Sequence, residues 1–508
     1  MIRRRPPRVG DLLIRTAERV PDQEALIEGE VRLTYARFCD RATRFAAALQ
    51  RLRVEPGERV GLLLPNGVAF AVAHFGSLLA GAISLPLNTR LAPAELEFII
   101  NDARASVLLV HAAFREAWGS VRGNLPGVKH AIAVGEPHGG LLTFDELLGE
   151  PATSWRTHRS EEDEVACILY TSGTTGLPKG AMLTHRNILF NNASCKAHLG
   201  YLPTDRTLIV LPMFHVTALN SQLSAFVEIG GTMVIMAAYQ TREVIRQLAE
   251  HRITCAFFVP TVCTLLLLSP HLAGTDLGTL RLIAYGGAPM SPETIRGLRE
   301  RFPGVGVINA YGLTETSSLT TALPPADAES RSDSVGLPVS RTRIRIVDER
   351  GRDLPPGEVG EIWIKGGQVV RGYFNRPEAT AQAIVDGWLR TGDLGRLDDQ
   401  GYLYLVDRKK DMIIRGGENI YSIEVEAVLN AHPKLLESAV VPHPDPVFGE
   451  VVKAVCVPRP GERATAEEIV AFCRERLADY KVPVQVRFVE ELPRNPGGKV
   501  LKGVLKGL

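Results

Sequence analysis

Short apolar runs alternate with helical patterns through the middle of the chain, from about residue 165 to residue 309. The runs at 208–211, 233–237 and 255–259 are typical of buried strands, and another apolar stretch at 167–170 precedes them. Helical periodicity marks residues 242–251 and 292–301. Strands that alternate with helices predict an α/β fold in which a largely parallel sheet is wrapped by helices.

One uncharged stretch, residues 68–87, has about the length that spans a bilayer and must be compared with a transmembrane helix. Polar and helix-breaking residues interrupt the stretch: His74, Gly76, Ser77, Gly81 and Pro86. Its last part, 83–87, resembles a strand. We therefore predict a buried helix followed by a strand, and no integral membrane segment.

The pattern changes after about residue 333 to short strands punctuated by glycine and proline, such as 343–347 and 361–365. A charged cluster at 407–411 then precedes a separate α+β pattern. In that pattern 451–458 alternates like a half-buried strand, and Thr465 with Glu468 forms a capping box that opens a helix. We predict a large N-terminal domain over 1–407 with a β-rich subdomain from about 335, a hinge at 408–411, and a small mobile α+β domain over 412–508.

Composition fits this division and narrows the function. The chain has 508 residues, 45% of them apolar, which is ample for a large core. Its 58 basic and 57 acidic side chains give a net charge of +1, so no overall field recruits nucleic acid or an anionic membrane. Seven scattered cysteines without a Cys-x-x-Cys pair indicate thiols in a reducing cytosol. The basic segment 3–8 is followed by no apolar signal core, so the sequence does not predict export. We expect a cytoplasmic protein whose partners are small molecules.

Residues 170–180, Tyr-Thr-Ser-Gly-Thr-Thr-Gly-Leu-Pro-Lys-Gly, carry the clearest chemical signal. The glycines let backbone N–H groups approach a ligand, the hydroxyls donate hydrogen bonds, and Lys179 adds a charge, as a polyphosphate requires. Gly173 and Gly176 are too close together for a Walker A loop, and Lys179 is followed by Gly180 rather than Ser or Thr. The segment therefore predicts a different kind of phosphate loop, with ATP as its natural ligand.

Other polar candidates also follow strands. His215 comes after 208–211, the segment 286–289 after 281–285, and the segment 311–315 after 305–309. Because nucleotides bind at the carboxyl ends of strands in open α/β folds, we predict one site assembled at one edge of a sheet.

These motifs give the chain its resemblance to a known family. The blocks, in chain order, are 170–180, Leu-Pro-Met-Phe-His at 211–215, 286–289, Tyr-Gly-Leu-Thr-Glu at 311–315, Thr-Gly-Asp at 391–393, 407–411, Gly-Gly-Glu-Asn at 416–419 and Asn-Pro-Gly-Gly-Lys at 495–499. In this order they resemble the adenylate-forming (ANL) superfamily, specifically its acyl-CoA synthetases, the AMP-dependent synthetase and ligase family. Firefly luciferase and nonribosomal-peptide adenylation domains share the superfamily. The resemblance covers nearly the whole chain.

The resemblance implies an enzyme, an acid–thiol ligase that uses ATP, Mg²⁺ and coenzyme A. It would convert a carboxylic acid to acyl-AMP with release of pyrophosphate, and would then transfer the acyl group to the CoA thiol with release of AMP. Positioning and neutralisation of phosphate charge dominate such a reaction. The residues implied in ATP and AMP binding are Thr171, Ser172, Gly173, Thr174, Thr175, Gly176, Lys179, Gly287, Ala288, Pro289, Asn309, Tyr311, Gly312, Thr314, Asp393, Arg408 and Lys499.

The implied catalytic residues are Lys499, Glu315, Thr171 and His215. Lys499 would bridge the carboxylate and the α-phosphate, whereas considered alone it is one more cation in a lysine-rich tail. Glu315 would hold Mg²⁺, whereas an isolated acid at a helix start is more often a surface residue. Asp393 and Arg408 would hold the ribose, although isolated charges are mostly exposed. Tyr311 would stack on adenine, although a lone tyrosine after a strand is more often a core residue.

The resemblance also assigns the acyl and CoA sites. The acyl pocket would be lined by His215, Val216, Asn220, Tyr285, Gly286, Gly287 and Ala310. Its walls, 214–222, 258–265, 285–288 and 309–310, are mostly apolar and lack arginine, so we predict an apolar fatty or aryl acid rather than a dicarboxylate. His215 has even odds of being a packed imidazole or a functional one. The candidates for CoA binding are Gly416, Gly417, Phe448, Tyr480 and Lys481, and the domain would rotate about Lys410.

Three alternatives stay open on the sequence: a stand-alone adenylation domain, a luciferase-like oxygenase, and a non-catalytic nucleotide-binding protein on the same scaffold. The retention of both Glu315 and Lys499 argues against the last. The oligomeric state is open, with a homodimer as one arrangement.

Overall fold

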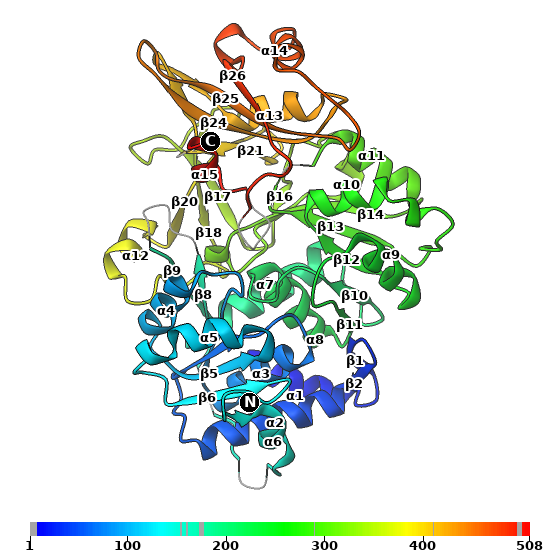
Figure 1. The fold of residues 1–508 in the computed structure, drawn as a ribbon, viewed down its shortest axis with the longest axis vertical. Coiled ribbons are helices and arrows are strands. Elements are labelled where there is room, and N and C mark those ends of the chain that lie inside the picture. Colours follow the sequence, from blue (N-terminus) through cyan, green and yellow to red (C-terminus); the bar gives the residue numbers. More distant parts are fainter. Residues whose placement is uncertain are drawn as a thin grey trace.

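The computed structural model describes residues 8–152, 155–158, 161–171, 177–288, 290–409, 411–494 and 500–508. Figure 1 shows a large body drawn from blue to yellow and a smaller orange and red unit stacked on one end of it. The large domain with mostly parallel sheets and the smaller domain at the end of the chain confirm the predicted α/β architecture.

A nine-stranded sheet forms one half of the large domain, in the order β16-β15-β14-β13-β12-β10-β11-β1-β2. The strands from β14 to β1 run parallel, and β2, β15 and β16 pair antiparallel at the edges. Their bounds are β1 Glu24–Glu28, β2 Val31–Thr34, β10 Arg206–Ile209, β11 Thr232–Ile235, β12 Cys255–Phe258, β13 Leu282–Gly286, β14 Gly306–Tyr311, β15 Thr321–Ala322 and β16 Leu337–Pro338.

A seven-stranded sheet forms the other half, in the order β7-β6-β5-β3-β4-β8-β9. All its pairs are parallel except the last, where β9 returns antiparallel to β8. Their bounds are β3 Arg59–Leu63, β4 Ile83–Pro86, β5 Ala105–His111, β6 His130–Val134, β7 Leu142–Thr143, β8 Val165–Thr171 and β9 Lys179–Thr184.

Helices pack on both faces of the two sheets. The largest apolar core joins residues of both sheets to α1, α2, α3, α7 and α8, whereas α9, α10 and α11 cover the outer face of the nine-stranded sheet, and α4 and α5 the outer face of the seven-stranded one. The stretch 68–87 forms the buried helix α3 followed by β4, as expected. The helices are α1 Val9–Arg19, α2 Tyr35–Arg51, α3 Val68–Ala80, α4 Pro93–Asp102, α5 Arg115–Val121, α6 Phe144–Gly149, α7 His185–His198, α8 Ala225–Ile229, α9 Thr241–Glu250, α10 Pro260–Leu268 and α11 Pro292–Arg301.

Two five-stranded sheets complete the chain. The first, β17-β18-β20-β19 with β21 on β20, includes the helix α12 Pro377–Ala383 between its strands. The second, β23-β22-β25-β24 with β26 on β25, is the sheet of the small domain. The strands are β17 Arg343–Val347, β18 Gly360–Lys365, β19 Ile384–Val385, β20 Trp388–Leu397, β21 Leu403–Arg408, β22 Ile413–Arg415, β23 Glu418–Ile420, β24 Leu435–Asp445, β25 Gly449–Pro458 and β26 Gln485–Phe488, and the helices of the small domain are α13 Ser422–Asn430, α14 Ala466–Arg474 and α15 Lys502–Lys506.

Two expectations about strands were wrong. The segment 165–309 does not form one sheet, because β8 pairs with β4 and β9 in the seven-stranded sheet while β10 to β14 build the other. Within the predicted stretch 451–458, residues 451–457 are all buried rather than alternating, since β25 pairs with β22, β24 and β26 and both of its faces meet apolar clusters. The capping box of Thr465 and Glu468 is confirmed at the start of α14.

None of the helices within the described ranges is long and apolar enough to cross a membrane. The domain boundaries at 407 and 412 stay predictions.

Candidate active site

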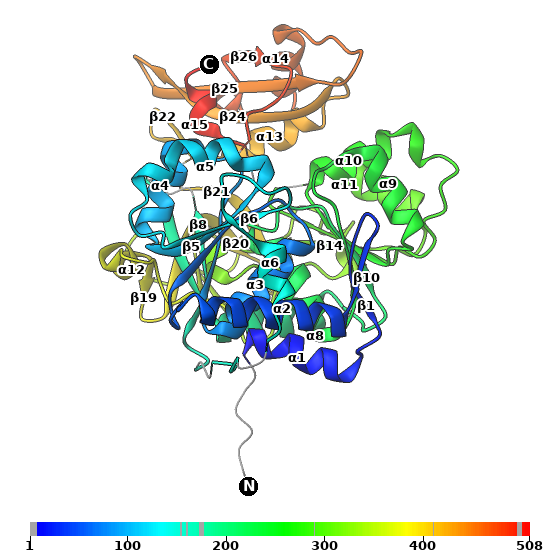
Figure 2. The same ribbon diagram turned by 60° about the horizontal axis from the view of Figure 1, so that its bottom comes forward.

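Strands from three sheets carry the predicted site residues. Thr171 ends β8 and Lys179 begins β9 in the seven-stranded sheet, Tyr311 ends β14 in the nine-stranded sheet, and Asp393 lies on β20 in the next one. The site is thus built between sheets rather than at one edge of a single sheet. Figures 1 and 2 show α15, at the end of the chain, on the side of the small domain that faces the large domain.

The predicted ribose and adenine residues are brought together. The hydroxyl of Tyr311 donates to Asp393 Oδ2 at 2.7 Å, and Arg408 Nε lies 3.5 Å from Asp393 Oδ1. Asp393 and Arg408 are directly opposite each other on β20 and β21, so the sheet register fixes their approach. Burial, and then the charge of Asp393, raises the pKa of Tyr311 well above its usual value, so the phenol keeps its proton and donates a hydrogen bond to the carboxylate.

Glu315 is held in a tight turn directly after β14. The turn requires glycine at 312, because a Cβ there would lie 1.3 Å from the carbonyl oxygen of Ser318. Ser317 and Ser318 close the turn with positive φ angles of 55° and 112°, which cost free energy for residues other than glycine. Strain of this kind persists only where surrounding contacts impose it, and it indicates a turn built for a function.

The Glu315 carboxylate is oriented by a residue that the motifs did not single out. Tyr373 donates its hydroxyl hydrogen to Glu315 Oε1 at 2.8 Å, and Lys179 Nζ lies 5.5 Å from the centroid of the Tyr373 ring. Thr314, next to Glu315, is half-buried in the same turn. Glu315 and Lys179 are therefore both brought to one tyrosine, Glu315 to its hydroxyl and Lys179 to its ring.

The ends of the phosphate loop pair with each other. Thr171 and Lys179 are partners in the β8–β9 ladder, and the Thr171 hydroxyl donates to the Lys179 carbonyl at 3.4 Å. The predictions for Ser172, Gly173, Thr174, Thr175, Gly176, Pro289, Lys410 and Lys499 fall outside the described residues. The ends of the segment that contains Lys499 do pair: Arg494 bridges to Val500, and Leu501 N donates to Pro493 O at 2.8 Å.

The ends of β13 and β14 form a close pair beside this site. Gly286 is opposite Ala310, and a Cβ on Gly286 would lie 2.3 Å from the Ala310 carbonyl oxygen, so only glycine fits. Gly287 and Ala288 follow as exposed residues. Asn309 does not point into an open site, because its amide donates to Ser334 O at 2.9 Å and is buried. Tyr285 packs in the core on the outer face of the sheet, and its buried hydroxyl finds no hydrogen-bond partner among the residues that the structure describes.

His215 precedes a π-helix over Thr217–Ser224. The Thr217 N–H donates to His215 Nδ1 at 3.4 Å, so the ring proton belongs on Nε2. Burial lowers the pKa of His215 to about 4, which keeps the imidazole neutral near neutral pH. Val216 is buried, and Asn220 donates to Ser317 O at 3.1 Å, which ties this helix to the turn that carries Glu315. π-Helical turns are often found at functional sites.

The CoA candidates separate into two groups. Gly416 N donates to Phe448 O at 2.9 Å, and both Gly416 and Gly417 are exposed with positive φ angles. Lys481 instead pairs with Glu424 on α13 at 2.6 Å, next to Tyr480. The structure therefore brings Phe448 to the glycine pair, and no hydrogen bond or ion pair within the described residues joins Tyr480 or Lys481 to it.

Within the described residues no group of three or more His, Cys, Asp or Glu side chains could hold a metal. A divalent ion at Glu315 would therefore need oxygens of the nucleotide as further ligands.

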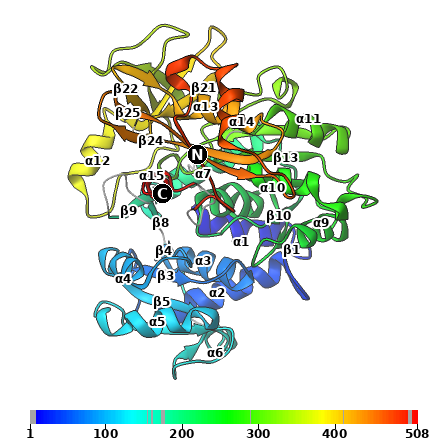
Figure 3. The same cartoon turned by 45° about the horizontal axis from the view of Figure 1, so that its top comes forward.

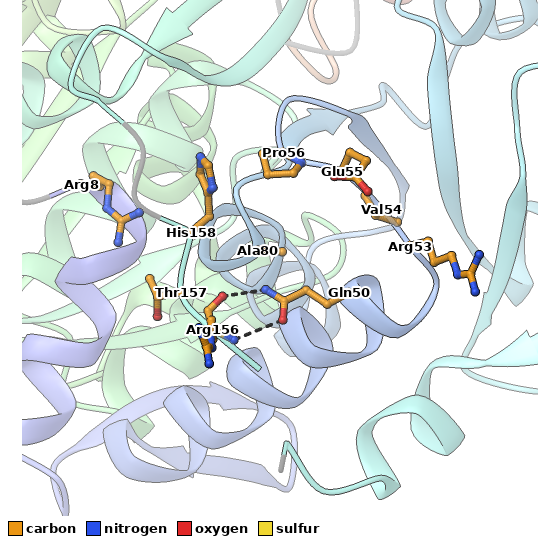
Figure 4. A pocket seen from close by; sticks show the side chains of 10 residues that line it. All are labelled: Arg8, Gln50, Arg53, Val54, Glu55, Pro56, Ala80, Arg156, Thr157 and His158. Carbon is orange, nitrogen blue, oxygen red and sulfur yellow. Dashed lines mark hydrogen bonds between the residues drawn. The ribbon is translucent and has the colours of Figure 1, made fainter. Parts of the chain in front are cut away.

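A cavity of about 840 Å³ opens at the ends of α2 and α3, where Gln50 and the backbone of Arg156 exchange hydrogen bonds (Figure 4). None of the predicted site residues lines it.

Comparison with known proteins assigns the family. The family model for AMP-binding enzymes matches residues 13–374, and the model for the C-terminal domain of AMP-binding enzymes matches residues 424–499. The chain belongs to the AMP-binding enzyme family. The predicted membership of the adenylate-forming acyl-CoA synthetases is confirmed.

Individual relatives cover the chain almost from end to end. A feruloyl-CoA synthase from Amycolatopsis is 37% identical over 505 residues, with 98% of each chain covered. The long-chain-fatty-acid–CoA ligase FadD13 of Mycobacterium tuberculosis is 36% identical over 509 residues, again with 98% of each covered. Among solved structures, the anthranilate CoA ligase AuaEII in complex with anthranoyl-AMP superposes with a TM-score of 0.93 at 29% identity, covering 99% of this chain and 97% of that one.

Proposed function

We propose that this enzyme is an ATP-dependent acid–CoA ligase that acts on an apolar fatty or aryl carboxylic acid. It forms acyl-AMP with release of pyrophosphate, and then transfers the acyl group to the thiol of CoA with release of AMP. The observation that carries the proposal is the convergence of Asp393 with Tyr311 and Arg408, together with the approach of Glu315 and Lys179 to one tyrosine. ATP needs both groups of residues, one at its ribose and one at its phosphates.

At the ribose end, Asp393 has the chemistry to accept hydrogen bonds from the two vicinal hydroxyls. Tyr311 and Arg408 orient the carboxylate through both of its oxygens, so little rotational freedom is lost when the nucleotide binds. The ring of Tyr311 is the candidate surface for adenine.

At the phosphate end, Glu315 fits a role as the carboxylate that holds Mg²⁺ together with phosphate oxygens. The ion would neutralise charge on the transferring phosphates. The hydroxyls of Thr171 and Thr314 would donate to phosphate oxygens, and Lys179 would steady the loop. We assign Lys499 as the cation that joins the carboxylate of the acid to the α-phosphate.

The second step requires that a thiol approach the same acyl carbonyl after pyrophosphate has left. We propose rotation of the small domain about Lys410, which would remove Lys499 and bring Gly416 and Gly417 to the site. The exposure of both glycines supports a role in which backbone lines a narrow passage for the pantetheine arm. Phe448 beside them is a candidate for contact with CoA.

The acyl pocket is proposed from walls at 214–222, 258–265, 286–288 and 310, without Tyr285, which packs in the outer core, and without Asn309, which bonds to Ser334. A neutral His215 would contribute a polar edge near the carbonyl without adding charge. The relatives include one enzyme named for an aryl acid and one named for long-chain fatty acids, so their names support both classes. Seven free thiols support a reducing, cytoplasmic location.

A pyrophosphate-release assay over fatty, aryl and dicarboxylic acids, with and without CoA, tests the proposal. We expect release with monocarboxylic apolar acids and thioester formation only when CoA is present. Lys499→Ala should lower adenylation by at least about a hundredfold and largely spare thioester formation from supplied acyl-adenylate. Lys506→Ala, an exposed lysine of the same tail, is the matched control. Equal loss in both half-reactions would contradict the role of Lys499, and no release with any acid would contradict the ligase.

A further inference from the structure

Tyr373 contacts both groups that the phosphate end requires, although no motif singled it out. Its hydroxyl donates to Glu315 Oε1 at 2.8 Å, and its ring faces the ammonium of Lys179 at 5.5 Å from the centroid. The side chain is half-buried, so the hydrogen bond is partly shielded from water.

The backbone around Tyr373 is fixed to the strand that carries Lys179. Residues 371–374 run beside β9: Phe374 N donates to Gly180 O at 2.8 Å, and Met182 N donates to Gly372 O at 2.9 Å. Tyr373 itself bridges to Ala181. The segment acts as an additional strand on β9, so its position follows that of the phosphate loop.

The same segment also holds the backbone of Glu315. Val370 N donates to the Glu315 carbonyl at 3.0 Å, and the Ser317 hydroxyl donates to Gln368 O at 2.9 Å. Residues 368–374 therefore bind the Glu315 turn at one end and β9 at the other. The hydroxyl of Tyr373 extends this connection to the Glu315 carboxylate.

A hydrogen bond to one carboxylate oxygen has a defined consequence for metal binding. Mg²⁺ demands near-ideal octahedral geometry, so a carboxylate that rotates freely must lose that freedom when the ion binds. A donor on Oε1 at 2.8 Å restricts the rotation of the carboxylate and would leave Oε2 for the ion.

We propose that Tyr373 is a positioning residue that orients the Glu315 carboxylate for a divalent cation and keeps it in register with Lys179. This role rests on the proposed function, in which Glu315 holds the metal of the ATP complex. Tyr373 touches neither substrate nor reacting atoms in this role.

Tyr373→Phe tests the proposal because it keeps the ring over Lys179 and removes only the hydroxyl. Mn²⁺ serves as the probe, with its free concentration measured by electron paramagnetic resonance in the presence of α,β-methylene-ATP, which the enzyme cannot cleave. We expect Mn²⁺ binding to the enzyme–nucleotide complex to weaken about tenfold, the size expected for a lost hydrogen bond to a charged group. Binding of AMP, measured without metal, should be unchanged.

Tyr402→Phe is the matched control. The hydroxyl of Tyr402 donates to Asp327 Oδ2 at 2.7 Å and Arg331 lies 4.0 Å from the centroid of its ring, so the same two kinds of contact occur away from the site. This variant should leave Mn²⁺ binding unchanged.

A double-mutant cycle with Glu315→Gln separates positioning from a general structural effect. In the Glu315→Gln background Tyr373→Phe should cause no further loss of Mn²⁺ affinity. The role would be overturned if Tyr373→Phe bound Mn²⁺ as tightly as the wild type does, or if its affinity for AMP fell as much as its affinity for Mn²⁺. It would also be overturned if Tyr373→Phe caused the same loss of Mn²⁺ affinity in the Glu315→Gln background. Wild-type protein that binds Mn²⁺ with the nucleotide but activates no acid would refute the proposed function and leave the positioning role standing.

Discussion

Lys502 gives the sharpest test of how the small domain is held together. Its ammonium lies 2.7 Å from Glu426 Oε1 and also donates to Ser422 Oγ, whose hydroxyl in turn donates to Asp407 Oδ1 at 3.0 Å. The side chains of Lys502 and Glu426 are each only 16% exposed. The pair therefore links the end of the chain through α13 to the last strand of the large domain.

Lys502→Met should leave Glu426 buried without its cation. Removing one partner of a buried ion pair costs about 3–5 kcal/mol, and the residual exposure of this pair places the expected loss near the lower end, at about 3 kcal/mol. Glu426→Gln combined with Lys502→Met should recover most of that loss, because both charges are then gone and Val440 N can still donate to the amide oxygen.

All four tryptophans, at 118, 155, 363 and 388, lie outside residues 412–508, so tryptophan fluorescence would not report unfolding of that segment directly. Hydrogen exchange measured by mass spectrometry is therefore the assay. A loss of about 3 kcal/mol should lower the protection of amides in α13 and α15 by roughly a hundredfold, while β10 to β14 keep theirs. Unchanged protection in Lys502→Met, or a double variant as unprotected as the single one, would refute the reasoning.

The pH dependence of this loss has a definite sign. Burial raises the pKa of Glu426, while Lys502 opposes that rise. In Lys502→Met the pKa of Glu426 must therefore rise further. When the pKa of a carboxyl is higher in the folded protein than in the unfolded chain, the free energy of unfolding rises as the pH falls. The loss of unfolding free energy in Lys502→Met is therefore largest at alkaline pH and becomes smaller on acidification.

Two further predictions concern the site itself. Gly312→Ala should abolish AMP binding or lower the yield of folded protein, because its Cβ would overlap the Ser318 carbonyl, while Gly119→Ala, which meets nothing within 4 Å, should leave both measurements unchanged. Burial holds the pKa of His215 near 4 in the folded protein, so the unfolded chain takes up a proton first as the pH falls and the wild type loses free energy of unfolding. His215→Asn lacks this group, so between about pH 7 and about pH 5 it should lose about 1–2 kcal/mol less than the wild type, measured by thermal unfolding. A wild type and variant with parallel pH profiles would show that His215 is not buried as a neutral ring.

The sequence predicted those strands and helices of the large domain whose apolar runs have a clear period and clear breakers, and it left most of the others unassigned. It placed residues 292–301 and 343–347 at the bounds found in α11 and β17. It could not tell that β8 and β10 belong to different sheets, since an apolar run marks a buried strand and does not name its neighbours. The burial of β25 on both faces was missed for the same reason.

The candidate site was predicted from the order of its motifs rather than from the physics of any single residue. Asp393 and Arg408 look like surface charges until β20 and β21 place them opposite each other. Tyr373 had no signal at all: it follows Gly372 in a half-apolar run, and its partner Glu315 is 58 positions away in the sequence. Contacts of this kind depend on the sheet register, which no local pattern encodes.

The position of β1 has a consequence for how the protein is made. Leu26 pairs with Met233 in the parallel β1–β11 ladder, and the Tyr35 hydroxyl donates to the carbonyls of Phe226 and Gly231. β2 pairs with β1 at once, but a ribosome must translate about two hundred more codons before β1 finds its parallel neighbour β11, and such distant pairings slow folding. Until then the nascent amino-terminal segment exposes an unpaired apolar edge, which makes it a natural client for chaperones during synthesis.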